Sequence, residues 1–311
     1  IKINAFFLMP LVFFIVNYQS LRGLKKIAEF SFFYRASQSL FAIISILILY
    51  QFIDSSIVPI YAYLTSLVIV SLLSFLSFRF WLKKKSNGHK EANLEILKYS
   101  TIFKVSLPLM FAQSVQFLMA WTDKLMIGGM LNSEAVGIYH TAFKLSMFSA
   151  IALMSINSIA SPKFAEKFYN NDFIGLKKIS NQSTKLIFVS SIPLIILSFL
   201  FPKLLLGIFG KEFVSGTIAF LILSVGRLIS SLSGPAGNIL QMTNNQNIYA
   251  KILFIGALFN IVLNYILIPI YGVNGAAIAS MLSLVIWNVL MIYQVRRKFG
   301  FYTFYQPFKN D

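Results

Sequence analysis

Long apolar stretches separated by short polar segments run through the whole of this 311-residue chain. A helix needs about 20 apolar residues to cross roughly 30 Å of hydrocarbon, and each stretch reaches or approaches that length. The stretches are too long and unbroken for strands of a transmembrane barrel, which would alternate in segments of about ten residues. We therefore expect an all-α integral membrane protein with about nine transmembrane helices, near residues 1–18, 36–52, 57–80, 105–127, 137–160, 186–206, 213–232, 252–270 and 273–295.

The composition agrees with a surface that faces lipid. Hydrophobic residues make up 57% of the chain and charged residues only 12%, whereas about a quarter of the residues in a soluble domain are charged. The first residue is not a methionine and lies inside an apolar run. That run is too long for the core of a signal peptide. We expect an N-terminally truncated fragment.

The positive charge has a regular distribution. The net charge is +17, from 27 lysines and arginines against 10 acidic residues. Such a balance can indicate nucleic-acid binding, but here the basic residues alternate with apolar runs and form no continuous basic face. Most lie in alternate loops, and the opposite loops hold only Lys203 and Lys211. The positive-inside rule then predicts a bacterial inner-membrane protein with a cytoplasmic C-terminus. This distribution explains the net charge without a nucleic-acid partner.

The longest polar segment divides the predicted helices. It reads WLKKKSNGHKEANLEILKYS over residues 81–100 and separates three helices from six. We predict three helices over residues 1–82, a cytoplasmic linker with a surface helix over 83–102, a six-helix lobe over 103–298 and a cytoplasmic tail over 299–311.

Several kinds of chemistry are excluded. Without cysteine there is no disulfide or thiolate site, and His89 and His140 are too few for a multi-histidine metal site. No Walker A motif occurs. A membrane glycan polymerase would need acidic residues in a large external loop, and here Asp54, Glu134 and Glu212 lie on separate short turns. We expect neither an enzyme nor a bound cofactor or metal.

Charged residues inside the predicted helices are candidates for binding substrate, because a charge at mid-membrane costs at least about 2.5–3.5 kcal/mol. Arg227 shares a helix face with Ser224 and Ser231, which suits a cavity, although a structural contact or an anchor at the cytoplasmic end is the alternative. Lys144 faces either a cavity or the external interface. Lys124 either binds substrate, pairs with the adjacent Asp123 or extends its ammonium to the interface.

Neutral polar residues inside the helices are further candidates. Gln116 and Asp123 share one face of their helix, and Asn260 and Asn264 share another with Gly256. For the asparagines, hydrogen bonding between helices with close packing at the glycine is the alternative that we favour.

Two runs resemble a known family. They are PLMFAQSVQFLMAWTDKLMIGGMLNSEAVGIYHTAFKL, over residues 108–145, and FNIVLNYILIPIYGVNGAAIASMLS, over residues 259–283. They resemble the O-antigen and capsule polysaccharide flippases of the multidrug/oligosaccharidyl-lipid/polysaccharide exporter superfamily. The residues that carry the resemblance are Asp123, Lys124, Ile127, Gly128, Val136, Gly137, Ile138 and Tyr139, then Asn260, Asn264, Pro269, Gly272 and Gly275.

This resemblance implies a two-lobe transporter of six plus six helices, of which the chain would be a remnant lacking three. It implies flipping of oligosaccharide linked to undecaprenyl pyrophosphate, for lipopolysaccharide or capsule synthesis, by alternating access. The predicted contacts with the substrate are Arg227, Lys144, Lys124, Asp123, Gln116, Asn260 and Asn264. The lipid-linked oligosaccharide and membrane lipids are the expected partners, and a glycan polymerase and a chain-length regulator are candidates.

Two other functions stay open at this point. A drug or metabolite antiporter of the same superfamily would usually need carboxylates in its cavity, and Asp123 is the only acid within a long span. A membrane glycan polymerase or ligase, or a scaffold of a glycan-assembly complex, belongs to a different class.

Overall fold

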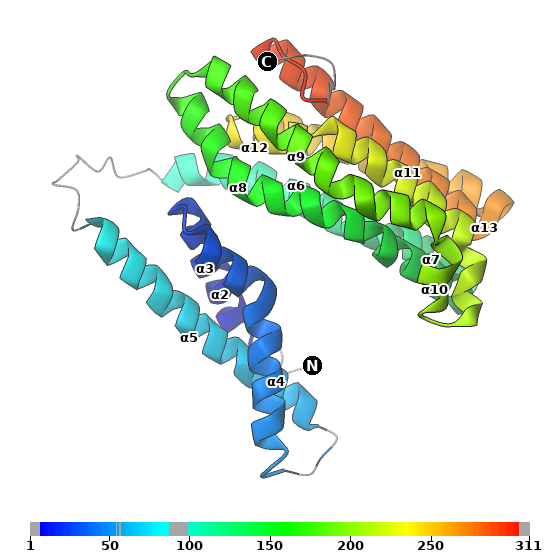
Figure 1. Cartoon of the computed structure of the whole chain (residues 1–311), viewed down its shortest axis with the longest axis horizontal. Coiled ribbons are helices and arrows are strands. Elements are labelled where there is room, and N and C mark those ends of the chain that lie inside the picture. Colours follow the sequence, from blue (N-terminus) through cyan, green and yellow to red (C-terminus); the bar gives the residue numbers. More distant parts are fainter. Residues whose placement is uncertain (1–6, 54, 56, 87–98, 305–311) are drawn as a thin grey trace. The chain divides into compact units, whose positions relative to one another are not determined.

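The computed structural model describes residues 7–53, 55, 57–86 and 99–304 (Figure 1). Over these residues all regular structure is helical, which confirms the all-α class. The chain divides into two compact units, residues 1–96 and 97–311, and each is described by itself.

The first unit packs two helical segments against one long helix. Its core is aromatic, with Phe14, Tyr18, Phe30 and Phe33 buried. The helix that begins at Ile27 passes through a π-helical turn, and its later part packs on the long helix, as does the first helix. The elements are α2 (Leu8–Gly23), α3 (Ile27–Phe32), η1 (Phe33–Ser37), α4 (Gln38–Leu49) and α5 (Val58–Ser86).

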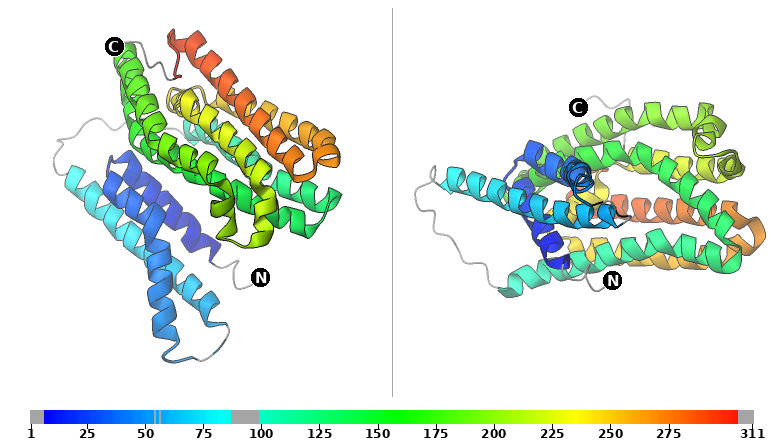
Figure 2. Two further views of the ribbon diagram at one scale, coloured as in Figure 1. Left: turned by 45° about the vertical axis from the view of Figure 1, so that its right-hand side comes forward. Right: turned by 90° about the horizontal axis from the view of Figure 1, so that it is seen from below.

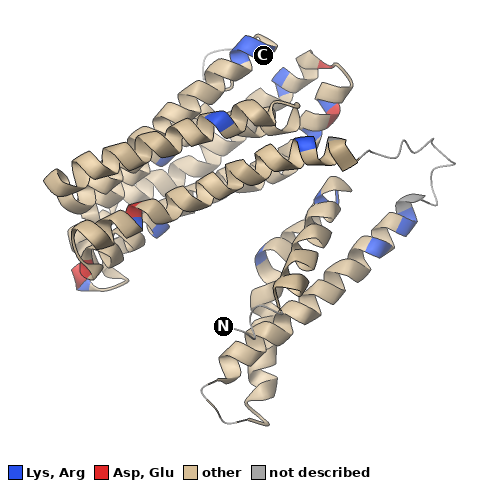
Figure 3. Ribbon diagram, turned by 180° about the vertical axis from the view of Figure 1, so that it is seen from behind, with Lys and Arg blue, Asp and Glu red and all other residues tan. Residues whose placement is uncertain are grey.

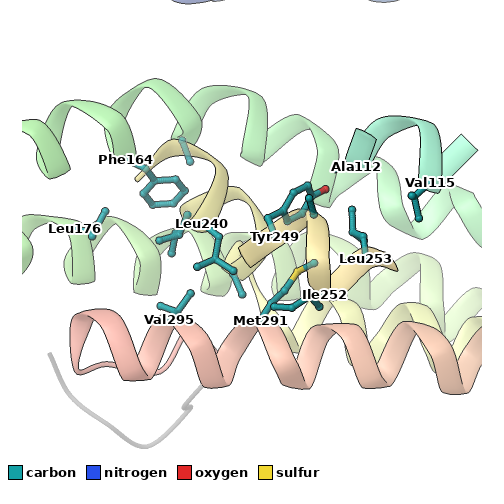
Figure 4. Close-up of a cluster of buried hydrophobic side chains, with 14 of the residues drawn as sticks. Ala112, Val115, Phe164, Leu176, Leu240, Tyr249, Ile252, Leu253, Met291 and Val295 are labelled. Atoms are coloured by element: carbon teal, nitrogen blue, oxygen red, sulfur yellow. The ribbon is translucent and has the colours of Figure 1, made fainter. Parts of the chain in front are cut away.

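The second unit is a bundle in which α13 packs on α6 and α11, and α9 packs on α8 and α11 (Figure 2). An apolar cluster around Leu240, Tyr249, Leu253 and Met291 joins α6, α8, α9 and α13 (Figure 4). The elements are α6 (Tyr99–Met130), α7 (Ser133–Ser146), η2 (Met147–Ser149), α8 (Ala150–Tyr169), α9 (Phe173–Leu200), α10 (Pro202–Gly207), η3 (Lys211–Gly216), α11 (Thr217–Ser233), α12 (Ala236–Met242) and α13 (Gln246–Phe299).

The predicted spans fall on these helices. Within the described residues, 7 helices are long and apolar enough to cross a membrane. One of them, α13, holds two predicted spans, because its backbone breaks at Gly272. The first predicted span falls on α2, of which 16 residues are described. The chain is a multi-pass membrane protein.

The predicted linker over residues 83–102 begins inside α5 and ends inside α6, which extend to Ser86 and from Tyr99. Its central part, with the predicted surface helix, lies outside the described residues. The predicted tail also begins with ordered structure. Phe301 is buried, the Thr303 hydroxyl donates to the Ser233 carbonyl at 2.8 Å, and the Thr184 hydroxyl donates to the Thr303 carbonyl at 2.7 Å.

A tight turn inside α13 positions the candidate site. Gly272 has φ 56° and ψ −133°, a conformation that side chains disfavour. Past the turn, Gly275 approaches the preceding arm so closely that a Cβ atom there would clash with the Leu267 carbonyl. The residues before and after Gly272 therefore form two arms of a close-packed hairpin.

Candidate substrate-binding site

A buried carboxylate joins three helices of the second unit. The side chain of Asp123, on α6, is 3% exposed. It accepts hydrogen bonds from the Tyr139 hydroxyl of α7 at 2.6 Å and from the Asn264 and Asn260 amides of α13 at 2.6 and 3.1 Å. The Ser280 hydroxyl, on the second arm of α13, donates to the same carboxylate. We call these five residues the Asp123 cluster.

Local structure explains how these residues meet. Asn264 and Ser280 lie eight residues on either side of Gly272, so the hairpin brings both to the same height. Asn260 lies one turn before Asn264 on the same face. On α7, the Asn132 side chain accepts from the Ala135 amide at 2.8 Å and fixes the start of the helix, two turns before Tyr139.

All four partners of the Asp123 carboxylate are hydrogen-bond donors, so both of its oxygens are satisfied within the bundle. The Arg227 guanidinium of α11 lies within electrostatic range of Tyr139. A positive charge therefore lies close to the Asp123 cluster.

The predicted basic residues also gather in one place. The Lys124 ammonium lies 4.9 Å from the Trp121 ring centroid and 5.7 Å from that of Phe143, and the Arg227 guanidinium lies 5.5 Å from the Phe143 ring centroid. Lys124 and Lys144 lie within electrostatic range of each other. We call Lys124, Lys144 and Arg227 the basic cluster.

The structure thus sorts the predicted residues into two sets and leaves one apart. Asn260 and Asn264 both donate to Asp123. Lys124 and Arg227 lie beside Phe143, and Lys144 lies within electrostatic range of Lys124. Gln116 lies elsewhere, where its amide donates to the Tyr249 hydroxyl at 2.9 Å. Adjacent in sequence, Asp123 and Lys124 have different surroundings, since the carboxylate accepts from neutral donors and the ammonium lies over aromatic rings. Their contact with substrate stays a prediction.

The asparagines show the helix-to-helix bonding that we favoured for them, and Gly256 packs against Trp287 of the other arm of α13. On the Arg227 face of α11, Ser224 and Ser231 are buried. The Ser224 hydroxyl donates to the Phe220 carbonyl of its own helix at 2.8 Å, so it is already satisfied there.

Sequence reasoning did not select Tyr139, Phe143 or Ser280 as site residues. Tyr139 was visible only as part of the family motif. Ser280 could have been found from the mirror spacing of Asn264 and Ser280 about Gly272, once a hairpin is assumed. Phe143 gave no signal, because one phenylalanine in an apolar helix is unremarkable.

The chemistry of the site is that of charge recognition. Among the described residues, no group of three or more histidine and acidic side chains could hold a metal ion. The Asp123 cluster has a single carboxylate, and four donors already occupy its two oxygens. The basic cluster carries only positive groups and suits an anion.

Comparison with known proteins shows two families that match this chain. Residues 1–168 match the family described as polysaccharide biosynthesis protein, and residues 108–266 match the family MatE. A probable low-salt glycan biosynthesis flippase, Agl15 of Haloferax volcanii, is 25% identical over 232 residues, which are 74% of this chain and 47% of that protein. The capsular polysaccharide biosynthesis protein CapF of Staphylococcus aureus is 27% identical over 75% of this chain and 59% of its own length.

The fold is that of solved MATE transporters. A mutant of the Vibrio cholerae MATE transporter VcmN superimposes with a TM-score of 0.75 at 10% identity, covering 91% of this chain and 66% of its own. The chain spans about half the length of the curated relatives it matches.

Proposed function

We propose that this chain, which belongs to the polysaccharide biosynthesis protein and MatE families, takes part in flipping a lipid-linked oligosaccharide across a membrane by alternating access. The observation that carries the proposal is the basic cluster. Lys124 and Arg227 lie beside Phe143, and Lys144 lies within electrostatic range of Lys124, in helices that are otherwise apolar. Charges are costly there unless they bind something negative.

The substrate we propose is an oligosaccharide on undecaprenyl pyrophosphate. Its two phosphates are the most anionic part of such a molecule, and a guanidinium can bind phosphate oxygens through two parallel hydrogen bonds, while lysine supplies a point charge. Polar side chains such as Gln116 would contact the glycan, and the polyprenyl tail would stay in lipid. The names of the glycan flippase and capsule relatives support a glycan substrate.

No covalent step is needed for this transfer, so we propose a transporter and not an enzyme. The Asp123 cluster would act as a fixed joint that keeps α6, α7 and α13 together while the unit moves. We place the protein in the bacterial inner membrane with a cytoplasmic C-terminus. A glycan polymerase and a chain-length regulator would be its neighbours in lipopolysaccharide or capsule synthesis.

The test is substitution of Arg227 in the full-length protein. Arg227→Ala should abolish surface glycan at unchanged abundance in the membrane, and Arg227→Lys should retain part of the activity. Lys203→Ala, at an exposed lysine of α10, is the matched control and should leave surface glycan at the level of the unmodified protein. Loss of abundance with intact activity per molecule would make Arg227 structural and overturn its proposed role.

A drug or metabolite antiporter is the second candidate, because the fold is shared with MATE transporters. Its cationic substrates would need a free carboxylate, and Asp123 is already bound by four donors. Expression in a drug-sensitive strain separates the two functions. Resistance that depends on Asp123 but not on Arg227 would favour the antiporter.

A further inference from the structure

An open groove lies along α6. In the sequence it ends more than one helical turn before Lys124, the first residue of the basic cluster. It has a volume of about 700 Å³ and is lined by Gln113, Ser114, Gln116, Phe117 and Leu118. Gln113 and Ser114 are exposed. An exposed amide on a membrane-spanning helix is unfavourable against lipid tails, so these side chains indicate a surface that meets water or a polar ligand.

Two aromatic rings continue the groove toward the basic cluster. Phe117 and Trp121 are one helical turn apart, with ring centroids 6.2 Å from each other. Their side chains are 65% and 49% exposed. At 100° per residue, Gln113, Phe117, Trp121 and Lys124 fall on one side of α6. We call these four residues the α6 stripe.

The α6 stripe combines the groups that recognise a sugar ring. A pyranose presents a face of C–H groups, which packs on an aromatic ring, and a rim of hydroxyls, which an amide can serve as both donor and acceptor. Gln113 supplies such an amide. Neighbouring Gln116 is fixed by its bond to Tyr249, so it can hold one side of the groove in place.

The α6 stripe lies beside the basic cluster, and this indicates which sugar of the substrate it would bind. Lys124 belongs to both sets, since its ammonium lies over the Trp121 ring and within electrostatic range of Lys144. Gln113 and Lys124 are eleven residues apart, which is about 16 Å along a helix. That distance suits a pyrophosphate at one end and one or two sugars along the rest.

We infer that the α6 stripe is a subsite for the sugar attached directly to the pyrophosphate, with the ring stacked on Trp121 and Phe117 and the hydroxyls bound by Gln113. This inference rests on the proposed function and deepens it. Packing of the same aromatic rings against lipid tails is the competing outcome, and it would give them no preference for a sugar.

The test compares two synthetic probes on the purified full-length protein by isothermal titration calorimetry. One probe is geranyl pyrophosphate, and the other is the same lipid with N-acetylglucosamine joined to its pyrophosphate. The unmodified protein should bind the sugar-bearing probe about tenfold more tightly. Trp121→Ala and Gln113→Ala should bring that ratio close to one without changing the affinity for geranyl pyrophosphate, and Trp121→Phe should keep most of it.

The matched control is Phe111→Ala, at an exposed aromatic residue on another side of α6 that packs against Phe254. It should keep the full ratio. Equal binding of both probes by the unmodified protein would overturn the subsite and leave the proposed function standing. An equal loss for both probes in Trp121→Ala would show that Trp121 only positions Lys124, which also overturns it. Failure of both probes to bind would overturn the proposed function itself.

Discussion

Asp123 shows how a single buried carboxyl group can organise a membrane-embedded unit. Each of its four donors is a neutral side chain from another part of the fold, from Tyr139 on α7 to Ser280 near the end of the chain. The carboxylate therefore fixes positions that are up to 157 residues apart in sequence. Its removal would leave several buried donors without a partner.

We expect Asp123→Ala to destabilise the protein by about 2 kcal/mol, since hydrogen bonds between helices in membranes average about 0.6 kcal/mol each. The measurement is the melting temperature in detergent. Thr122→Ala is the control, because the Thr122 hydroxyl bonds only within α6, to the Leu118 carbonyl at 2.8 Å. Equal melting temperatures for the two variants would show that the Asp123 cluster does not hold the helices together.

A second acid, Asp172, predicts a response to pH. Its carboxylate caps α9 by accepting from the Gly175 amide at 2.7 Å and pairs with the Lys167 ammonium at 2.6 Å. The hydrogen bond from Lys167, then the one from Gly175, lowers the pKa of Asp172 below its ordinary value. The ionised Asp172 carboxylate therefore adds its full stability at a pH above the ordinary aspartate pKa. That stability is lost as the pH falls through the lowered pKa of Asp172.

Asp172→Asn should remove that acid-sensitive contribution. The expected effect is small, because an exposed pair in water is screened by solvent. Melting curves of the two proteins recorded from neutral to strongly acidic pH test this. The curves should converge as the pH falls, and a constant difference at every pH would contradict the assignment.

At the scale of elements, the α13 hairpin has the greatest influence on the site. Asn260 and Asn264 on its first arm and Ser280 on its second arm all donate to Asp123. Their meeting at one carboxylate depends on the close approach of the two arms at Gly275. A Cβ atom at Gly275 would overlap the Leu267 backbone, so the two arms would have to separate.

Gly275→Ala should therefore destabilise the protein by about 1–3 kcal/mol, the usual cost of overpacking. Loss of melting temperature is the readout. Gly129→Ala is the control on α6, since a Cβ atom there would meet no atom within 4 Å. If both variants melt alike, the hairpin is not under the packing constraint that we describe.

The elements themselves could be predicted from the sequence, and their neighbours could not. Apolar length predicted where the 7 candidate spans of the described residues lie, and it also predicted the break between the two arms of α13. Helical periodicity grouped Gln116 with Asp123 on one face, yet Gln116 bonds to Tyr249 while Asp123 bonds to Asn260 and Asn264. Periodicity states which residues of one helix share a face. It does not state which helix that face meets, so Ser280 and Phe143 were beyond its reach.

On the scale of the whole molecule, charge is separated along the second unit. Basic residues gather at the end formed by the α8–α9 turn and the end of α13 (Figure 3). These segments lie together, since Phe299 contacts the rings of Phe168 and Phe173 with centroids 6.2 and 6.1 Å apart. Lys203 and Lys211 come after the far end of α9, at the opposite end of the bundle from the α8–α9 turn. This separation is the physical basis of the predicted orientation.

Labelling of single cysteines in the full-length protein tests that orientation, and the absence of cysteine from this chain keeps its background low. Lys178 lies in the first turns of α9, and both it and Ser133, at the start of α7, are exposed. We expect Ser133→Cys to react with a membrane-impermeant maleimide in intact cells, because this turn has few basic residues. Lys178→Cys should react only after the membrane is opened. Ser133 is preferable to the neighbouring Asn132, whose side chain caps α7. Reaction of position 178 in intact cells would reverse the orientation, and with it the cytoplasmic placement of the C-terminus.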